Sequence, residues 1–236
     1  MERTDFVPGT SFKIIQDTEL FCYGTDSLLL ADFALKNPHC IQKNSLACDL
    51  GCGNAIIPLI LSAKSNAKKI YGIEAQKKSA ELAKKNVKLN SLEEKISILN
   101  ANLKNLFETE NSIQKNTFDA VLANPPYFSD GSGEKNSALE LSFSRHQNQD
   151  TNEIFIKSAS LLLKSQKSFF MINRPCELEN LLFLMHKYKL EAKHLKFVYP
   201  SPQKNASMVL IHAVKSAKPS LCIEKPLFIS EIKNVF

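Results

Sequence analysis

Several features that mark other protein classes are missing from this chain of 236 residues. No apolar run approaches the roughly 20 residues that span a bilayer, so we expect no membrane segment. The first residues, Met1 to Asp5, lack the basic and apolar regions of a signal peptide. The six cysteines show no paired-ligand spacing, and without an export signal we expect them to be reduced thiols in a cytoplasmic protein.

Motifs for several kinds of chemistry are also missing. The five histidines are widely spaced and form no recognisable metal or nucleophile–base motif, so we expect no metal. No Gly-Lys-Ser/Thr element cradles phosphates, and no Pro-Cys element supplies a nucleophile for activating a pyrimidine carbon. The acidic residues form no credible catalytic pair.

The composition that remains is that of a folded, mildly basic protein. Hydrophobic residues make up 44% and charged residues 23%, which is enough to build a sizeable core. The net charge of +6 comes almost wholly from lysine, since arginine occurs only at positions 3, 145 and 174. Such a surplus is compatible with a polyanionic partner, although a lysine-rich chain can also reflect nucleotide bias in the genome.

From residue 46 onward, short apolar runs alternate with helical patterns. This alternation predicts an α/β fold, with a mostly parallel seven-stranded sheet and helices on both faces. The last two strands are joined by residues 200–205 without a helix, which predicts an antiparallel hairpin at one edge. The expected strands are Leu46–Leu50, Lys69–Glu74, Ile96–Leu99, Phe118–Ala123, Lys167–Ile172, His194–Tyr199 and Met208–Val214. The expected helices are Asn54–Lys64, Lys77–Asn90, Asn152–Leu163 and Glu177–Tyr188.

The two ends of the chain do not follow the alternating pattern. We therefore expect an N-terminal extension or lid (1–45), a main domain (46–215) and a C-terminal tail (216–236). Within the extension, Asp26 is a suitable N-cap for a short helix that stops before Pro38. Two long flexible loops are expected at 108–117 and 129–144.

A glycine-containing loop follows the first strand of the main domain and opens a helix. Glycines at 51 and 53, after Asp49, let the backbone turn tightly and approach a ligand closely. Glu74 ends the next strand about 20 residues further on, where a carboxylate can bind the two hydroxyls of a ribose. Position 56 is isoleucine, so the dinucleotide pattern is incomplete. These features favour a nucleoside cofactor without a pyrophosphate.

The most informative run is Phe118 to Tyr127, where an apolar strand ends abruptly in Asn124-Pro125-Pro126-Tyr127. Neither proline has an N–H to donate, and each holds the preceding residue in an extended conformation. The stiff loop would present an amide, proline carbonyls and an aromatic face, which suit a planar substrate that carries an NH2 group. A plain strand-to-loop turn is the alternative for the tetrapeptide taken alone.

Together these residues resemble the class I S-adenosylmethionine-dependent methyltransferases. The resemblance implies that Asp49, Gly51 and Gly53 hold the methionine end of the cofactor and that Glu74 holds its ribose. Ala55 replaces the third glycine of the usual loop, which is tolerable if its φ is negative. The residue that meets the adenine would be Asn102, for which a helix N-cap is an equal alternative.

Within that family, the run ending in Tyr127 resembles the motif of amino-group methyltransferases. The Asn124 side chain and the Pro125 carbonyl would accept the two N–H bonds of the target amine and aim its nitrogen at the methyl group. Tyr127 would stack on the ring. Positioning and preorganised dipoles would supply most of the acceleration, so no separate strong base is needed.

The N-terminal segments 10–16 and 21–31 resemble those of bacterial tRNA adenine methyltransferases, which modify the 6-amino group of the adenine beside the anticodon of a valine tRNA. The resemblance covers nearly the whole chain and implies tRNA as partner. It also implies that Gly24, Thr25 and Asp26, with Asn124, help to close the cofactor pocket. Candidate RNA contacts are Arg145, Lys193 and Lys196, although a surface or edge-strand role is equally open for each. We expect a monomer or a weak dimer.

Three other functions stay open. Enzymes that methylate a glutamine amide on release factors carry the same tetrapeptide, but they usually have a longer helical N-terminal domain. A DNA adenine methyltransferase normally needs a target-recognition region, and no stretch of this chain is large enough. The changes at Ala55 and Asn102 also fit a binding module that has lost its activity.

Overall fold

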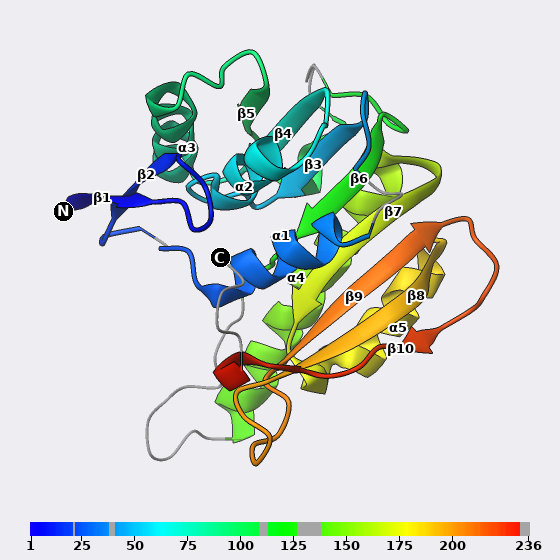
Figure 1. The fold of residues 1–236 in the computed structure, drawn as a ribbon. Helices are drawn as coiled ribbons and strands as arrows, with labels where there is room; N and C mark the ends of the chain where they lie inside the picture. Colours follow the sequence, from blue (N-terminus) through cyan, green and yellow to red (C-terminus); the bar gives the residue numbers. More distant parts are fainter. Residues whose placement is uncertain (21, 38–40, 109–112, 127–137, 232–236) are drawn as a thin grey trace.

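The computed structural model describes residues 1–20, 22–37, 41–108, 113–126 and 138–231. A nine-stranded sheet forms the centre, in the order β10-β8-β9-β7-β6-β3-β4-β5, with β11 also paired to β8 (Figure 1). Its strands are β3 (Leu46–Leu50), β4 (Lys69–Glu74), β5 (Ile96–Asn100), β6 (Phe118–Ala123), β7 (Leu163–Asn173), β8 (Leu190–Tyr199), β9 (Met208–Lys215), β10 (Cys222–Ile223) and β11 (Leu227–Phe228). The seven long strands confirm the expected sheet, and the two short ones are additions from the tail.

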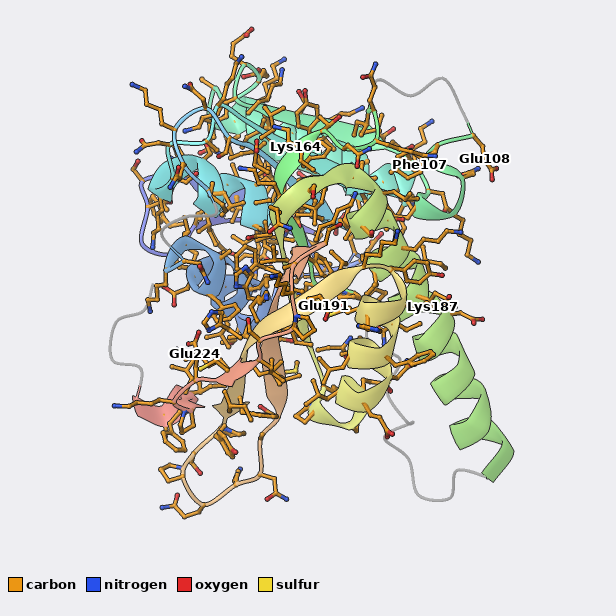
Figure 2. All side chains as sticks on the ribbon, turned by 90° about the vertical axis from the view of Figure 1, so that its right-hand side faces the viewer. Phe107, Glu108, Lys164, Lys187, Glu191 and Glu224 are labelled. Carbon is orange, nitrogen blue, oxygen red and sulfur yellow. The ribbon has the colours of Figure 1, made fainter. Side chains whose placement is uncertain are left out.

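Helices cover both faces of this sheet. They are α1 (Thr25–Leu35), α2 (Ile56–Lys64), α3 (Lys77–Leu89), α4 (Ala138–Leu162) and α5 (Leu178–Lys187), with short 3-10 turns at Leu103–Asn105, Pro175–Glu177 and Ile229–Glu231. Buried residues of α1, α2 and α3 share one apolar cluster with the sheet, and those of α4 and α5 share the other. Seen edge-on, the sheet stands between α1 and the pair α4 and α5, with Glu224 on the α1 side and Lys187 on the α5 side (Figure 2).

The direction of the strands determines where a ligand can bind. β3, β4, β5, β6 and β7 run parallel, whereas β9 is antiparallel to both β7 and β8, which confirms the expected hairpin. Because β4 and β6 pair with opposite sides of β3, the strand order reverses there. Ligands of open α/β sheets bind in the crevice at the carboxyl ends of the strands at such a reversal.

The central strands are apolar because both of their faces are covered. All six residues of β6 are buried, as expected for a parallel strand between two helical layers. At the opposite, amino end of the sheet, Asp119 accepts a hydrogen bond from the Leu46 N–H at 3.0 Å and pairs with Lys164 and Lys167. Burial acts to raise the pKa of Asp119, but these hydrogen bonds outweigh it and lower the pKa.

The N-terminal extension contains a hairpin that the sequence did not predict. β1 (Glu2–Phe6) and β2 (Lys13–Asp17) form a separate two-stranded antiparallel sheet. Oδ1 of Asn86 in α3 accepts a hydrogen bond from the Ile15 N–H at 2.7 Å, and its Nδ2 donates to the Ile15 carbonyl at 2.9 Å. Asn90 binds the backbone of Lys13 in the same way, at 2.8 and 2.7 Å. α3 therefore holds the hairpin by its backbone, while the domain boundary expected at residue 45 stays a prediction.

Other expectations concern the described residues as a whole. None of their helices combines the length and apolar character that a membrane crossing needs. No group of three or more histidine, cysteine or acidic side chains within the described ranges is placed to hold a metal ion. The cysteines among them, at positions 22, 48, 52, 176 and 222, are free thiols.

Candidate active site

A cleft of about 480 Å³ lies at the carboxyl ends of the central strands, within the range of small-molecule sites. Loops after β3, β4, β5 and β6 line it, together with one face of α4. The lining residues are Gly51, Gly53, Ile73, Glu74, Ala75, Gln76, Ser79, Ala101, Asn102, Leu103, Lys104, Asn124, Pro125, Pro126, Thr151, Ile154 and Phe155. The glycine loop, the spaced acid and the proline loop therefore meet in one cavity.

The glycine loop packs closely against its neighbours. Gly51 and Gly53 have φ values of +68° and +52°, which an L side chain rarely adopts. A Cβ on Gly51 would also lie 3.1 Å from the Phe155 ring. At Gly72 of β4, a Cβ would come within 2.7 Å of the Cys52 Sγ. The loop therefore depends on glycines for both its turn and its fit between β4 and α4.

The backbone N–H groups of the glycine loop form hydrogen bonds within the protein. Gly51 and Cys52 donate to the Ile73 carbonyl at 2.8 and 3.1 Å. Gly53 donates to Oε2 of Glu74 at 3.0 Å. Loops that bind a pyrophosphate instead direct such groups at the ligand. This arrangement supports the interpretation that the cofactor lacks a pyrophosphate.

Ala55 departs from the expectation for the third glycine position. Its φ is +70°, in the left-handed region, so the condition of a negative φ is not met. The residue stands at the N-cap of α2 and is fully buried. A left-handed conformation costs an alanine about 1–2 kcal/mol, so the loop keeps its glycine-like path at a local expense in stability.

Asp49 carries a buried carboxyl group that lacks a partner. The residue is 1% exposed, and neither oxygen has a hydrogen bond among the described residues. Burial, with the nearby Glu74 carboxylate, raises the pKa of Asp49 well above its usual range. Buried polar groups without a partner are rare and costly. Asp49 is not among the residues that line the cleft, so its expected contact with the methionine end of the cofactor stays a prediction.

Glu74 is held ready for a ligand by backbone amides on both sides. Its Oε2 accepts from Gly53, and its Oε1 accepts from the Gln76 N–H at 2.8 Å. The side chain is buried and lines the cleft. With both oxygens oriented, each still has a lone pair that can accept from a ribose hydroxyl.

Asn102 is placed in the cleft by the chain after β5. Its Oδ1 accepts from the Lys104 N–H at 3.0 Å and so caps the short 3-10 turn Leu103–Asn105. The N-cap alternative is therefore confirmed. Because a carbonyl oxygen has two lone pairs, the cap leaves room for a second donor, and contact with an adenine stays a prediction.

The proline loop begins directly after β6. Pro125 is buried, Pro126 is exposed, and Asn124 is partly buried between α1 and the cleft. The Asn124 Nδ2 donates to Oγ of Ser27 in α1 at 3.1 Å. Tyr127 lies outside the described residues. The catalytic roles of all four residues stay predictions.

The first turn of α1 reaches the carboxyl ends of β6 and β7 without lining the cleft. The N-cap of α1 is Gly24, so the expectation that Asp26 caps the helix is wrong. Asp26 lies inside the first turn, where burial raises its pKa and the charge of Arg174 acts to lower it. The expected role of Gly24, Thr25 and Asp26 in closing the cofactor pocket stays a prediction.

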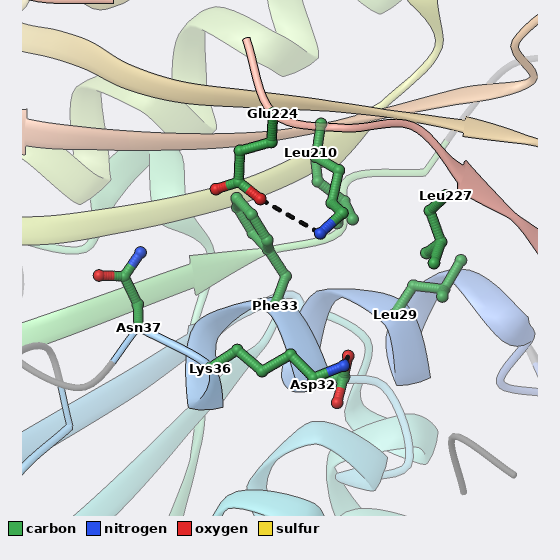
Figure 3. A pocket seen from close by; sticks show the side chains of 9 residues that line it. Leu29, Asp32, Phe33, Lys36, Asn37, Leu210, Glu224 and Leu227 are labelled. Carbon is green, nitrogen blue, oxygen red and sulfur yellow. Dashed lines mark hydrogen bonds and ion pairs between the residues drawn. The ribbon is translucent and has the colours of Figure 1, made fainter. Parts of the chain in front are cut away.

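The lysines expected at an RNA surface are engaged within the protein. Lys193 of β8 donates to the Lys218 carbonyl and to Oγ of Ser220. Lys196 pairs with Glu224 at 3.1 Å, beside a small pocket of about 100 Å³ between α1 and the C-terminal segment (Figure 3). Arg145 lies on the part of α4 whose side chains are not described. Contact of Arg145, Lys193 and Lys196 with RNA stays a prediction.

Several residues of the cleft were not found from the sequence. α4 contributes Thr151, Ile154 and Phe155, and α3 contributes Ser79. The spacing of 151, 154 and 155 is that of one helix face, so a signal was present. Only the packing of α4 across the glycine loop shows that this face covers the cleft rather than the core alone.

The comparisons with known proteins agree with this geometry. Residues 13–197 match the family described as methyltransferase small domain. A relative from Porphyromonas gingivalis, named tRNA1(Val) (adenine(37)-N6)-methyltransferase, is 27% identical over 213 residues. That match covers 88% of this chain and 80% of the relative.

Two solved structures have the same fold. A protein from Agrobacterium tumefaciens, described as a predicted O-methyltransferase, has a TM-score of 0.67 at 21% identity, covering 86% of this chain and 87% of its own. A geranyl diphosphate C-methyltransferase from Streptomyces coelicolor, in complex with S-adenosyl-L-homocysteine, has a TM-score of 0.55 at 13% identity. That match covers 79% of this chain and 78% of the other.

Proposed function

Because the chain belongs to the methyltransferase small domain family, we propose that it transfers a methyl group from S-adenosylmethionine to the 6-amino group of an adenine in tRNA. The adenine at position 37 of a valine tRNA is the specific target, by analogy with the relative of that name. We propose the cytoplasm as the place of this activity. The observation that carries the proposal is the position of Asn124-Pro125-Pro126 in the same cleft as Gly51 and Glu74.

The donor set of the cleft fits S-adenosylmethionine. Glu74 would accept from the ribose hydroxyls. Asp49 lies behind the cleft lining, and its buried carboxyl group would receive the ammonium of the methionine end once the glycine loop exposes it. The loop amides that a phosphate would need are already bound to Ile73 and Glu74. The cofactor supplies an electrophilic methyl group on a positively charged sulfur.

The protein's own groups would make the adenine amine reactive by holding it. The lone pair of an aromatic amine is shared with the ring, which makes the nitrogen a poor nucleophile. Acceptors at the Asn124 side chain and the Pro125 carbonyl would draw the two N–H bonds into one geometry and return electron density to the nitrogen. Forming the carbon–nitrogen bond would break the methyl–sulfur bond, whose electron pair would stay on sulfur, and one amine proton would leave to solvent. No strong base is required of the protein.

The proline loop suits a base that has left its stack. Stiff backbone at residues 125 and 126 keeps the acceptors in place before the base arrives. A base in an RNA loop is already unstacked, whereas one in a duplex must first be flipped out at a cost of a few kcal/mol. An adenine beside an anticodon is of the first kind, which favours tRNA over duplex DNA.

The test is methyl transfer from radiolabelled S-adenosylmethionine to unmodified total tRNA, run beside a release factor and duplex DNA. Nucleoside analysis of the labelled tRNA identifies the product. Asn124→Ala serves as the active-site variant. We expect label in tRNA as 6-methyladenosine and its loss in the variant.

Each other outcome changes the assignment in a defined way. Label only in the release factor would transfer the same cleft to a glutamine amide, which is also a planar NH2 group. Label in tRNA on another atom would contradict the amino-group chemistry. No label in any substrate, together with no binding of S-adenosylmethionine, would identify an inactive member of the fold.

A further inference from the structure

A hydrogen bond joins the first turn of α1 to the proline loop. Asn124, at the end of β6, donates from Nδ2 to Oγ of Ser27 at 3.1 Å, and the two residues are 97 positions apart in the chain. Ser27 is 4% exposed. The bond therefore joins two segments that only the tertiary structure brings together, at the edge of the cleft.

Ser27 is held rigidly by the helix that carries it. Leu28, Leu29 and Leu30 follow it directly and are buried in the apolar cluster beneath α1. A side chain on so well anchored a turn can act as a fixed reference point for a loop. The short stem of serine, with one χ angle to its hydroxyl, adds little freedom of its own.

A bond at one end of an amide determines where the other end lies. Nδ2 and Oδ1 of an asparagine stand on opposite sides of Cγ in one plane, and rotation about Cβ–Cγ is otherwise broad. With Nδ2 on Ser27, the plane of the Asn124 amide is set and Oδ1 lies on the side away from the serine. That oxygen is the acceptor that the proposed reaction uses.

We propose that Ser27 is a positioning residue, which acts through Asn124 to aim its carbonyl oxygen at the amino group of the substrate. The inference rests on the proposed function, because only a planar NH2 substrate needs that acceptor in one orientation. Ser27 touches neither substrate nor cofactor in this role. Its loss therefore lowers the rate of methyl transfer more than it weakens binding.

The first test compares three serine variants in steady-state methyl transfer. Ser27→Ala removes the hydroxyl, and Ser27→Thr keeps it. Ser62→Ala is the matched control, because Ser62 is a buried serine of α2 whose hydroxyl has no partner among the described residues. We expect Ser27→Ala to lower kcat by about 5- to 30-fold with the cofactor Kd unchanged, which is the size expected for one hydrogen bond that orients a reacting group.

Ser62→Ala and Ser27→Thr show whether Ser27 acts by positioning Asn124 or only by supporting the fold. Ser27→Thr regains most of the rate, and Ser62→Ala behaves as the wild type. In an Asn124→Ala background, measured under single-turnover conditions, Ser27→Ala brings no further loss, since the group it acts through is gone. A loss of the same factor in that background, or a threonine variant as slow as the alanine variant, overturns the proposal.

A spectroscopic measurement does not depend on the substrate. In protein labelled at asparagine nitrogen, Asn124→Ala identifies the side-chain NH2 signal of Asn124. Ser27→Ala shifts this signal and speeds its proton exchange, while Ser62→Ala leaves it in place. An unmoved signal overturns the inference even if tRNA is methylated. If the signal moves but the protein methylates no substrate, the orienting contact is supported and the proposed function is refuted instead.

Discussion

Replacing Asn86 with alanine is expected to destabilise the protein far more than one polar side chain on a helix usually would. Asn86 is fully buried, and it makes three hydrogen bonds to backbone groups. Two join it to Ile15 of the N-terminal hairpin, and the third runs from Nδ2 to the Asn54 carbonyl in the glycine loop at 3.0 Å. The residue thus ties the hairpin, α3 and the cofactor loop together.

The magnitude follows from what the truncation leaves behind. Each bond contributes about 1 kcal/mol, and each buried backbone group left without a partner costs more, so the loss is about 3–5 kcal/mol in total. A domain of ordinary stability has about 5–15 kcal/mol to lose. Urea unfolding followed by circular dichroism measures the change directly.

Asn90 provides the matched control one helical turn later. It binds the Lys13 N–H and carbonyl at nearly the same distances and also donates to the Asn86 carbonyl at 2.8 Å, but it is only half-buried, so water can replace its bonds to Lys13. Asn90→Ala is expected to cost less than about 1 kcal/mol. Asn86 lies inside α3 and Asn90 is its C-cap, so only Asn86→Ala gains helix propensity, which reduces the expected difference by less than about 1 kcal/mol. An Asn86→Ala value within about 1 kcal/mol of the Asn90→Ala value would refute the reasoning.

Three further predictions concern the site and its surroundings. Glu74→Gln keeps the size of the side chain but removes the charge, so S-adenosylmethionine should bind about 10- to 100-fold more weakly by calorimetry, while an unchanged Kd would exclude the ribose contact. Burial, helped by the charges of His194 and Lys193, lowers the pKa of His212 from 6.5 to about 4. Between these pH values the unfolded chain binds a proton that the folded chain does not. The folded state therefore loses about 3 kcal/mol of stability as the pH falls from above 6.5 toward 4. In urea unfolding at about pH 7 and about pH 4, His212→Phe should lose less stability between the two pH values than the wild type, by about 3 kcal/mol. Ala55→Gly relieves the left-handed strain but gives up a buried methyl, so its unfolding free energy should change by less than about 1 kcal/mol. Ala83→Gly, inside α3, should cost about 2 kcal/mol. Equal costs for the two variants would contradict the backbone strain at Ala55.

The sequence predicted the central elements well, because each carries its own local signal. The runs at Leu46–Leu50, Lys69–Glu74 and Phe118–Ala123 coincide with β3, β4 and β6. Apolar strands of this kind bury both faces, and Gly51 after β3 and the prolines after β6 mark the ends of those two strands. Glu74 and the residues after β6 could be assigned to the site for the same reason.

Prediction from the sequence failed where a segment is stabilised by distant partners. β1 and β2 are short, and β2 is held by asparagines of α3 that lie more than 70 positions away. β10 and β11 have two residues each and exist because the side of β8 was open to pairing. No local pattern distinguishes such segments from loops.

The left-handed conformation of Ala55 had a similar cause. Alanine prefers negative φ when considered alone, and this preference was the condition set for accepting it at this position. In this conformation the Ala55 N–H donates to the Cys52 carbonyl at 2.8 Å, and the Ala55 carbonyl accepts from the Leu59 N–H at 3.0 Å. Tertiary constraint here outweighs a local preference of about 1–2 kcal/mol.

By itself, the sequence determined the order of strands and helices and which strand ends carry polar or rigid groups. Those properties depend on neighbouring residues along the chain. The tertiary structure alone decided that Ser27 meets Asn124 and that Asn86 joins the hairpin to the glycine loop. It also decided that Asp49 is buried without a partner among the described residues. These contacts depend on β6 lying beside β3 and on α1 and α3 packing over the sheet. They arise from long-range packing, which no local stretch of sequence encodes.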